Sequence, residues 1–598
     1  MASSKKLILS LATISCLSSL ALAQISGPQP AITFNPDDYN YSYYGILGYA
    51  PGTQIEIQGN NTTNSLFLGK YAYVSYDNGT HTKTLHARVN NSDKLTIQNI
   101  INKGIVNGAL SIENQGQAQD VSIDINNINN QGYIRNVYIG IWGERNGKIE
   151  LDSFKNSALI YNTDNNGVLF EGKDVKIGKF INTGIIVGDY QNNSNKASVA
   201  IGQSNNNYGN TTIGLFLNEG LIGSDQSRFG VRFELGKQEQ NSQKPPHKAT
   251  IDHFINTGTI KSKSTGISIV EATLKNFLNM GLIESGMEQY ARAVEFYEKV
   301  KIENFTNAGT IKANNNAGII FRKSEVARFT NTGTISGKVG VALYGTTLSN
   351  FLNTGIITSN HDQAGAILLT SYNGNGQKTT ITNFINTGTI VSTQHDGLFI
   401  ETQSSIDHLY NKGMILAKQD GIALFSDGGS NKAEIKDITL AKGSMILAGN
   451  YGLNLSVLGN GQTTDQPVFV DAINIQEGAM LYGNKAAIYI GQNKDKNNNK
   501  KDNTVGQIIV AGEVKGGSEG GIVNEGTIKA SENKSSSENG KKRSRRSLED
   551  SSNQQSDEEN KAAILIKESG QITSTSGYGI VNKAMIDGSI ISKSSSNI

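Results

Sequence analysis

Large apolar residues alternate with small polar ones in a short phrase that returns along most of the chain. Its fullest form, Phe-x-Asn-x-Gly-x-Ile, occurs at 254–260 and at 384–390. Alternation of this kind puts one side of a strand in a core and the other side in solvent. Variants of the phrase occur at 180–186, 216–222, 277–283, 305–311, 329–335 and 351–357, with looser copies at 409–415 and 522–528. The recurrence indicates a repeating structural unit.

The spacing of the phrases predicts what the unit is. From Gly333 to Gly355 the step is 22 residues, and from Gly220 to Gly258 it is 38. The short steps match one turn of a solenoid, and the long steps match a turn that carries an inserted loop. Between phrases stand short apolar segments that each follow a Gly, such as 318–321 and 340–343. Three short strands per turn predict an all-β fold, a right-handed parallel β-helix.

A helical solenoid is not favoured, because apolar residues at i, i+3, i+4 and i+7 are scarce. The segment 287–300 comes closest to that pattern. Within it, however, 293–296 occupies the place that an apolar segment after a Gly has in neighbouring turns, so we expect a strand there.

Stacked turns place equal residues above one another. We therefore expect the Asn side chains of the phrase to form an amide ladder, and its Phe and Ile side chains to form apolar columns. At the end of each phrase the chain must turn. Asn near Gly is expected to take or flank the left-handed backbone conformation of that corner, which bulkier residues avoid.

The first 23 residues have the features of a secretory signal. Lys5 and Lys6 form a basic start, an apolar stretch follows at 7–20, and small residues precede a cleavage site after Ala23. A membrane anchor is the alternative, but the stretch is shorter than the ~20 residues that a span needs. Cleavage would remove Cys16, the only cysteine, and with it disulfide and thiol chemistry. A lipid on Cys16 is a further alternative, although Thr13 stands where such a site prefers Leu.

Composition agrees with a repetitive β architecture, since the 598 residues include 66 Gly and only 7 Pro. The formal charge is +2, which Lys5 and Lys6 account for, so the mature chain is formally neutral. Such a balance gives no reason to expect nucleic acid as a partner.

The expected organisation follows the repeat. After the signal peptide at 1–23, the Tyr-rich segment 24–95 is expected to be a β-rich cap, or alternatively a binding patch. The β-helix is expected over 96–530, with a polar insert near 494–503 that loops out of the stack. Residues 531–560 have the composition of a disordered, charged linker, and 561–598 are expected to form terminal β-helix turns.

A secretory leader, a cysteine-free mature chain and a Phe-x-Asn-x-Gly-x-Ile solenoid together resemble the passenger of a bacterial outer-membrane autotransporter. The resemblance covers about residues 1–590 and depends on the style of the repeat. It implies export and display or release at the cell surface. Such proteins end in a membrane β-barrel, for which 561–598 is too short. We therefore expect a truncated passenger, a barrel supplied separately, or a simply secreted chain.

Several short patterns suggest a catalytic or metal site, and each of them also has a structural interpretation. Asn162-Thr163-Asp164 resembles one motif of polygalacturonase-type hydrolases, but the companion motifs do not follow, and we interpret it as a turn. His361-Asp362 and His395-Asp396 could meet on adjacent turns and bind a metal, or simply form corners. His81 and His86 have no partner at metal-ligand spacing. Ser518 lies in a Gly-x-Ser-x-Gly sequence, but no helix pattern follows it, so we expect a Gly-rich corner.

Two patterns suggest modification. Arg543-Ser544-Arg545-Arg546 resembles a processing site in an exposed segment, with cleavage after Arg546. Asn40 lies in an acidic-residue-extended glycosylation sequence, Asp38-Tyr39-Asn40-Tyr41-Ser42. The alternatives are a solvated charged loop and a chance match.

We therefore expect a non-enzymatic surface or secreted protein, an adhesin-like passenger without catalytic residues, metal or cofactor. Its partners would be a host cell-surface protein or glycan, and the outer membrane through a missing or separate barrel. Long-step turns at 184–220, 220–258 and 355–388 would carry binding loops. A secreted vacuolating or pore-forming toxin is the alternative, and a polysaccharide-active enzyme is a more distant one.

Overall fold

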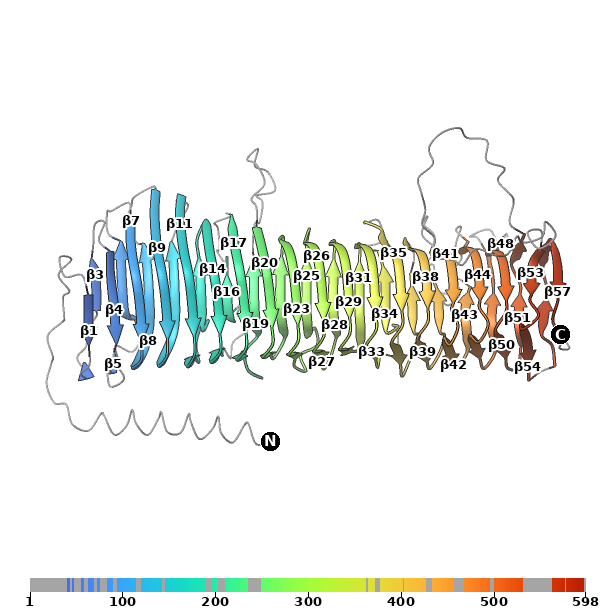
Figure 1. The fold of residues 1–598 in the computed structure, drawn as a ribbon, viewed down its shortest axis with the longest axis horizontal. Coiled ribbons are helices and arrows are strands. Elements are labelled where there is room, and N and C mark those ends of the chain that lie inside the picture. Colours follow the sequence, from blue (N-terminus) through green and yellow to red (C-terminus); the bar gives the residue numbers. More distant parts are fainter. Residues whose placement is uncertain are drawn as a thin grey trace. The chain divides into compact units, whose positions relative to one another are not determined.

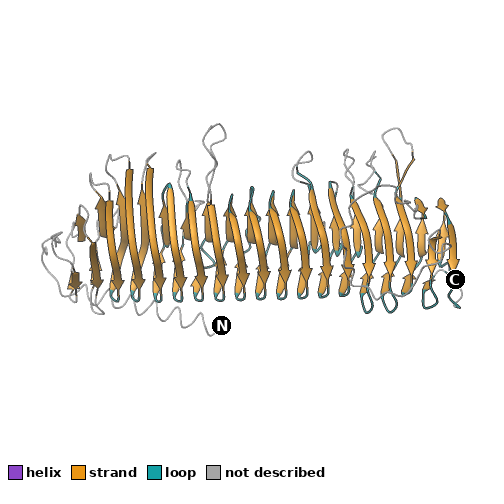
Figure 2. Cartoon of the chain, turned by 45° about the horizontal axis from the view of Figure 1, so that its top comes forward, coloured by secondary structure: helices purple, strands orange, loops and turns teal. Residues whose placement is uncertain are grey.

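The structure is a computed structural model, and it consists of β-strands joined by turns (Figures 1 and 2). It describes residues 40–43, 46–47, 55–58, 63–68, 73–75, 83–89, 94–114, 120–141, 146–189, 196–202, 210–234, 249–361, 364–371, 377–401, 403–425, 433–456, 467–494, 500–530, 562–575 and 577–595. Within these ranges there is no helix. The described residues accordingly include no helix long and apolar enough to cross a membrane.

The chain forms two compact units, residues 1–252 with 258–262, and residues 253–257 with 263–598. Most turns, or coils, of either unit have a long strand, then a short strand, then a third strand that we call Gly-led because a Gly stands near its start in most coils. In the first unit β8 (Ile105–Asn114) and β10 (Tyr133–Ile141) each cover the last two positions as one continuous strand. In the first unit the long strands are β1 (Asn40–Tyr43), β4 (Thr63–Leu68), β7 (Lys94–Asn102), β9 (Asp120–Asn130), β11 (Asn146–Asn156), β14 (Asp174–Asn182) and β17 (Thr211–Asn218). Strand β20 (Ala249–Asn256) runs from the first unit into the second.

The other strands of the first unit pair in the same parallel manner. They are β2 (Ile46–Leu47), β3 (Ile55–Gln58), β5 (Tyr73–Ser75), β6 (Lys83–Val89), β8 (Ile105–Asn114), β10 (Tyr133–Ile141), β12 (Leu159–Asn162), β13 (Val168–Glu171), β15 (Ile185–Gly188), β16 (Ala197–Ile201), β18 (Leu221–Ile222), β19 (Phe229–Glu234) and β21 (Thr259–Ser262). Strands of the Tyr-rich segment already belong to these rows, since β1 pairs with β4 and β2 with β5.

In the second unit the rows are regular. The long strands are β23 (Thr273–Asn279), β26 (Lys301–Asn307), β29 (Glu325–Asn331), β32 (Thr347–Asn353), β35 (Thr379–Asn386), β38 (Ser404–Asn411), β41 (Glu434–Leu440), β44 (Phe469–Ile475) and β49 (Thr504–Val510). The short strands are β24 (Leu282–Ser285), β27 (Thr310–Ala313), β30 (Thr334–Gly337), β33 (Ile356–Ser359), β36 (Thr389–Ser392), β39 (Met414–Ala417), β42 (Met445–Ala448), β45 (Met480–Gly483), β50 (Glu513–Gly516) and β54 (Gln571–Ser574).

The Gly-led strands of this unit are β22 (Thr265–Val270), β25 (Arg292–Tyr297), β28 (Ala317–Arg322), β31 (Val339–Tyr344), β34 (Ile367–Thr370), β37 (Leu398–Ile400), β40 (Ile422–Leu424), β43 (Tyr451–Leu455), β46 (Ala486–Ile490), β51 (Gly520–Asn524) and β55 (Ile580–Asn582). The remaining strands are β47 (Gln492–Lys494), β48 (Lys500–Asp502), β52 (Thr527–Lys529), β53 (Ala562–Ile566), β56 (Met585–Asp587) and β57 (Ser589–Ser592). All pair in parallel except β47 with β48, which form an antiparallel pair within the polar insert.

These rows confirm the parallel β-helix. Each strand pairs with its counterpart one coil later, for example β29 with β32, β30 with β33 and β31 with β34. The expectation of a strand at 293–296 is also confirmed, because these residues lie in β25.

The amide ladder is present in both units. In the second unit, Asn331 Nδ2 donates to Asn353 Oδ1 at 2.8 Å, and Asn353 Nδ2 donates to Asn386 Oδ1 at the same distance. In the first unit Asn102, Asn130, Asn156, Asn182 and Asn218 are linked in the same way. These side chains are buried, so the ladder satisfies amides that water does not reach.

The apolar columns form the core. The buried rings of Phe329 and Phe351 stack with centroids 4.7 Å apart, and Phe351 stacks on Phe384 at 4.6 Å. Ile335 of β30 and Ile357 of β33 pair in register beside them and are fully buried. Aromatic pairs of this kind contribute about 0.5–1.5 kcal/mol beyond the burial of their area.

The expectation of a left-handed corner at the Asn-x-Gly of the phrase is wrong. No phrase glycine from Gly184 to Gly413 has a positive φ; among the described residues that conformation falls elsewhere, as at Lys323, where φ is 48°. Lys323 lies between a Gly-led strand and a long strand. The phrase glycines are needed for close approach instead, because a Cβ on Gly333 would lie 2.1 Å from the carbonyl oxygen of Gly309 one coil earlier.

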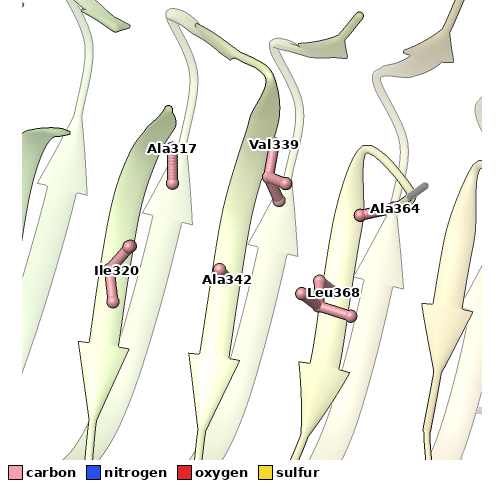
Figure 3. Packing of buried hydrophobic residues seen from close by; sticks show 6 residues of the cluster. All are labelled: Ala317, Ile320, Val339, Ala342, Ala364 and Leu368. Atoms are coloured by element: carbon pink, nitrogen blue, oxygen red, sulfur yellow. The ribbon is translucent and has the colours of Figure 1, made fainter. Parts of the chain in front are cut away.

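Some apolar side chains also pack outside this core. Ile320, Ala342 and Leu368 occupy equivalent outward positions on β28, β31 and β34, and all three are buried (Figure 3). Tyr344 and Phe399 pack against their cluster. The outer face of the Gly-led strands is therefore a second place where side chains gather.

Candidate functional site

The hydrolase-like motif of the first unit is part of a turn after β12. The Asn162 side chain is buried, accepts the Asp164 N–H at 3.0 Å and donates to the Asn166 carbonyl at 3.2 Å. Asp164 is exposed, and its carboxylate pairs with Arg135 at 2.5 Å. These contacts connect Asn162 to its own turn and Asp164 to Arg135 of the preceding coil, so both residues have structural roles.

The His-Asp pairs do not provide a described metal site. His395 Nδ1 lies 3.1 Å from Asp396 Oδ2, and the buried Asp396 carboxylate also accepts the Asp420 N–H at 2.8 Å. The His361 N–H donates to the Lys338 carbonyl, while residue 362 lies outside the described residues. Among the residues that the structure describes, no group of three or more His, Cys, Asp and Glu could hold a metal ion.

Asp396 and Asp420 belong to a second column of side chains that support stacking. Asp420 accepts the Tyr451 N–H at 3.1 Å through one oxygen and the Asn454 amide at 2.6 Å through the other. Burial raises the pKa of Asp420 to about 6, and the negative charge of Asp396 adds to the rise, against the opposing hydrogen bond from Asn454. In the first unit Asn166 accepts the Ala197 N–H in a similar role. An uncharged amide is therefore sufficient for this type of contact.

Other predicted sites are corners or lie outside the described residues. Ser518 is exposed between β50 and β51, and its N–H donates to the Asn484 carbonyl, so the Gly-x-Ser-x-Gly sequence leads into a strand. Asn40 lies in β1, where it pairs with Ser65, and His86 lies in β6; nothing is described of either side chain. The remaining predicted positions outside the described residues are Cys16, Ala23, His81 and the segment 543–546.

Of the tyrosines in the Tyr-rich start, Tyr41, Tyr43 and Tyr73 are described only as strand backbone and the others lie outside the described residues, as do large parts of the long-step loops. A different aromatic site is found on the outer face of the second unit. Tyr451 of β43 and Tyr489 of β46 stack with ring centroids 4.7 Å apart at 18°. Both rings are partly exposed. We call these two side chains the tyrosine pair.

Carboxylates fix both hydroxyls of the tyrosine pair. The Tyr451 hydroxyl donates to Glu519 at 3.1 Å, and the Tyr489 hydroxyl donates to Glu525 at 2.9 Å. Glu525 also pairs with Lys583 at 2.9 Å. Lys485 lies over the Tyr451 ring at 5.4 Å from its centroid, which is within the range of a cation–π contact.

The electrostatics keep these hydroxyls protonated. Burial raises the pKa of Tyr451, and the charge of Glu519 raises it further. Burial and the hydrogen bond to Glu525 raise the pKa of Tyr489 in the same way. The Lys583 ammonium lowers the pKa of Glu525, so this carboxylate is ionised and accepts hydrogen bonds. The site thus combines half-buried rings with fixed donors and acceptors, an arrangement typical of recognition surfaces.

This site could not be predicted from the sequence, because the tyrosine pair and its two carboxylate partners come from three coils, and the carboxylates lie in corners between strands. The available signal was a Tyr at an outward position of two successive Gly-led strands, at 451 and 489. The repeat phrase does not include these positions.

Comparison with known proteins adds no relative. No family model matches the chain, and no similar chain is found among curated proteins or among solved structures.

Proposed function

We propose that this chain is a non-catalytic binding protein, displayed at the cell surface or secreted, with the role of an adhesin-like autotransporter passenger. The secretory features of residues 1–23 and the parallel β-helix support this proposal. Its partner would be a host cell-surface protein or glycan.

The observation that carries the proposal is the tyrosine pair. Core packing does not require it, because Tyr451 and Tyr489 lie outside the solenoid, whereas Leu453 and Ile488 of the same strands are fully buried. Rigid, amphipathic rings bind partners at low cost in conformational entropy. The Glu519 and Glu525 carboxylates add hydrogen-bond acceptors for hydroxyl or amide groups of the partner.

Binding to host cells tests the proposal. The purified chain should bind saturably without releasing dye from liposomes, and Tyr451→Ala with Tyr489→Ala should weaken binding at least tenfold. Tyr290→Ala is the matched control, because Tyr290 is exposed outside this site. Equal binding by the double variant and the control would refute the role of the tyrosine pair. Liposome leakage would indicate a toxin instead, and release of reducing ends from acidic polysaccharide would indicate an enzyme.

A further inference from the structure

An open groove of about 590 Å³ crosses five coils on the outer face of the short strands in the second unit. Leu416, Leu447, Met480 and Tyr482 supply most of its apolar lining, and Lys418 and Lys515 supply its charges. The groove begins at the end of β36 and continues over β39, β42 and β45 to β50. It is separate from the tyrosine pair, which lies on the Gly-led strands.

The apolar lining is a local departure from the repeat. Parallel register places outward residues of successive short strands in one column, which reads Glu284, Lys312, Ser336, Thr358, Val391, Leu416, Leu447, Tyr482 and Lys515. The early coils stack with polar residues at this position. Stacking therefore does not explain the run from Val391 to Tyr482, and partly exposed apolar side chains in one column are typical of an interaction surface.

The charges of the groove select among partners. Lys418 and Lys515 are both exposed, and within the described residues neither side-chain ammonium group takes part in an ion pair or hydrogen bond. One carboxylate, that of Glu513, belongs to the same side of β50 as Lys515, and Glu513 is in register with Met480. Neither ammonium group is paired within these residues, although Glu513 lies near Lys515, and the complement of the groove is an apolar segment with two anionic groups.

The spacing of the two cations indicates the kind of chain that fits. Lys418 follows β39, and Lys515 lies on β50, three coils further on. At ~4.8 Å per coil the separation along the stack is roughly 14 Å. An extended peptide advances ~3.3 Å per residue, so about four residues cover this distance. A fatty acid carries one anionic group and matches only one of the lysines.

We propose that the groove binds an extended peptide segment of a partner protein, in which apolar residues lie between two carboxylates about four residues apart. This inference rests on the proposed function in that it names a partner class for a binding protein. The partner peptide would bind in the groove of the short strands and not at the tyrosine pair. The apolar side chains of the peptide would contact Leu416, Leu447 and Tyr482, and its carboxylates would pair with Lys418 and Lys515.

Fluorescence polarisation with a labelled Asp-Leu-Val-Leu-Asp peptide and the purified chain tests the proposal. We expect saturable binding that weakens at least tenfold in the Lys418→Gln/Lys515→Gln double variant. Asn in place of both Asp residues of the peptide should weaken binding to a similar extent. Lys436→Gln is the control, because Lys436 is also exposed but is paired with Asp407 on a long strand. It should bind the peptide as the unchanged protein does.

The outcomes separate this inference from the proposed function. Equal binding by the double variant and Lys436→Gln, or binding of phosphatidylglycerol vesicles but not of the peptide, would overturn the groove proposal. If cells are bound through the tyrosine pair while the peptide does not bind, only the groove proposal fails. If the peptide binds through the two lysines but cells are not bound, the groove proposal holds and the adhesive function fails.

Discussion

The amide ladder offers a direct test of what holds the coils together, because β32 carries two asparagines in different surroundings. Asn353 is fully buried in the inner ladder, whereas Asn350 is exposed and accepts a hydrogen bond from Asn383 at 3.0 Å. Asn353→Ala and Asn350→Ala therefore delete the same amide from the same strand, once in the core and once in water.

The expected difference follows from the contacts. Asn353 donates to Asn386 at 2.8 Å and, in two longer contacts, to the carbonyls of Gly355 at 3.3 Å and Thr389 at 3.4 Å, and it accepts from Asn331 at 2.8 Å. The two short bonds and the two long contacts together contribute ~3 kcal/mol at about 1 kcal/mol for each full hydrogen bond, and the Asn386 oxygen left without this donor adds about 1 kcal/mol or more. The total loss is ~3–5 kcal/mol. For Asn350→Ala water replaces the lost partner, so we expect a change within about 0.5 kcal/mol.

Hydrogen exchange measured by mass spectrometry is the suitable assay, because coils of a solenoid interact mainly with their neighbours and open locally. Peptides that cover β29 to β36 should exchange roughly 10²- to 4 × 10³-fold faster in Asn353→Ala, since each 1.4 kcal/mol corresponds to a factor of ten. In Asn350→Ala they should exchange at the unchanged rate. Equal acceleration in both variants, or less than tenfold acceleration in Asn353→Ala, would refute this account of the ladder.

Three further experiments address the close approach of the coils, the buried Asp420 and the outward position of Leu447. Gly333→Ala should destabilise its coil by several kcal/mol in hydrogen exchange, whereas Thr332→Ala beside it should have little effect, because only the former places a Cβ against a backbone oxygen. The pKa of Asp420 is about 6 when folded and 3.8 as the ordinary value, so the folded state binds the proton more tightly and stability falls as pH rises from about 4 to 6. Asp420→Asn should remove this dependence and stabilise the protein by up to ~3 kcal/mol at pH 7.5 in denaturant unfolding, with no gain at pH 3. Ile446→Ser should lower the free energy of unfolding by ~3–5 kcal/mol. Leu447→Ser changes the neighbouring residue, whose side chain points outward, and should lower it by less than ~1 kcal/mol; equal losses would show that Leu447 is a core residue.

The fold could be predicted because its strongest constraints repeat in the sequence. Phe329, Asn331 and Ile335 each have a counterpart at the same place in the next coil, so a single phrase defines an aromatic column, an amide ladder and an aliphatic column. The reason for the glycine was harder to predict. A Gly close to an Asn is typical of a left-handed turn, but the requirement at Gly333 is a close approach between coils, which depends on how the coils stack.

The candidate binding surfaces could not be predicted in the same way. Tyr451 meets Glu519 across 68 residues, and no local pattern connects them. The left-handed backbone conformation at Lys323 could not be predicted either, because Lys is not a residue type that favours this conformation. Contacts of this kind appear only when the register between coils is known.

The register also explains why recognition should reside in outward columns. An inward residue such as Ile446 has a counterpart above and below it, so a change in one coil disturbs the packing of two others. An outward residue such as Leu447 has no such constraint, because the same column holds Lys312 and Ser336 in earlier coils without loss of strand pairing. The outer surface can therefore change residue by residue while the stack stays constant. The run from Val391 to Tyr482 puts apolar residues in a column that holds polar residues in earlier coils, without interrupting strand pairing, and this freedom of the outer surface is why we propose a binding site there.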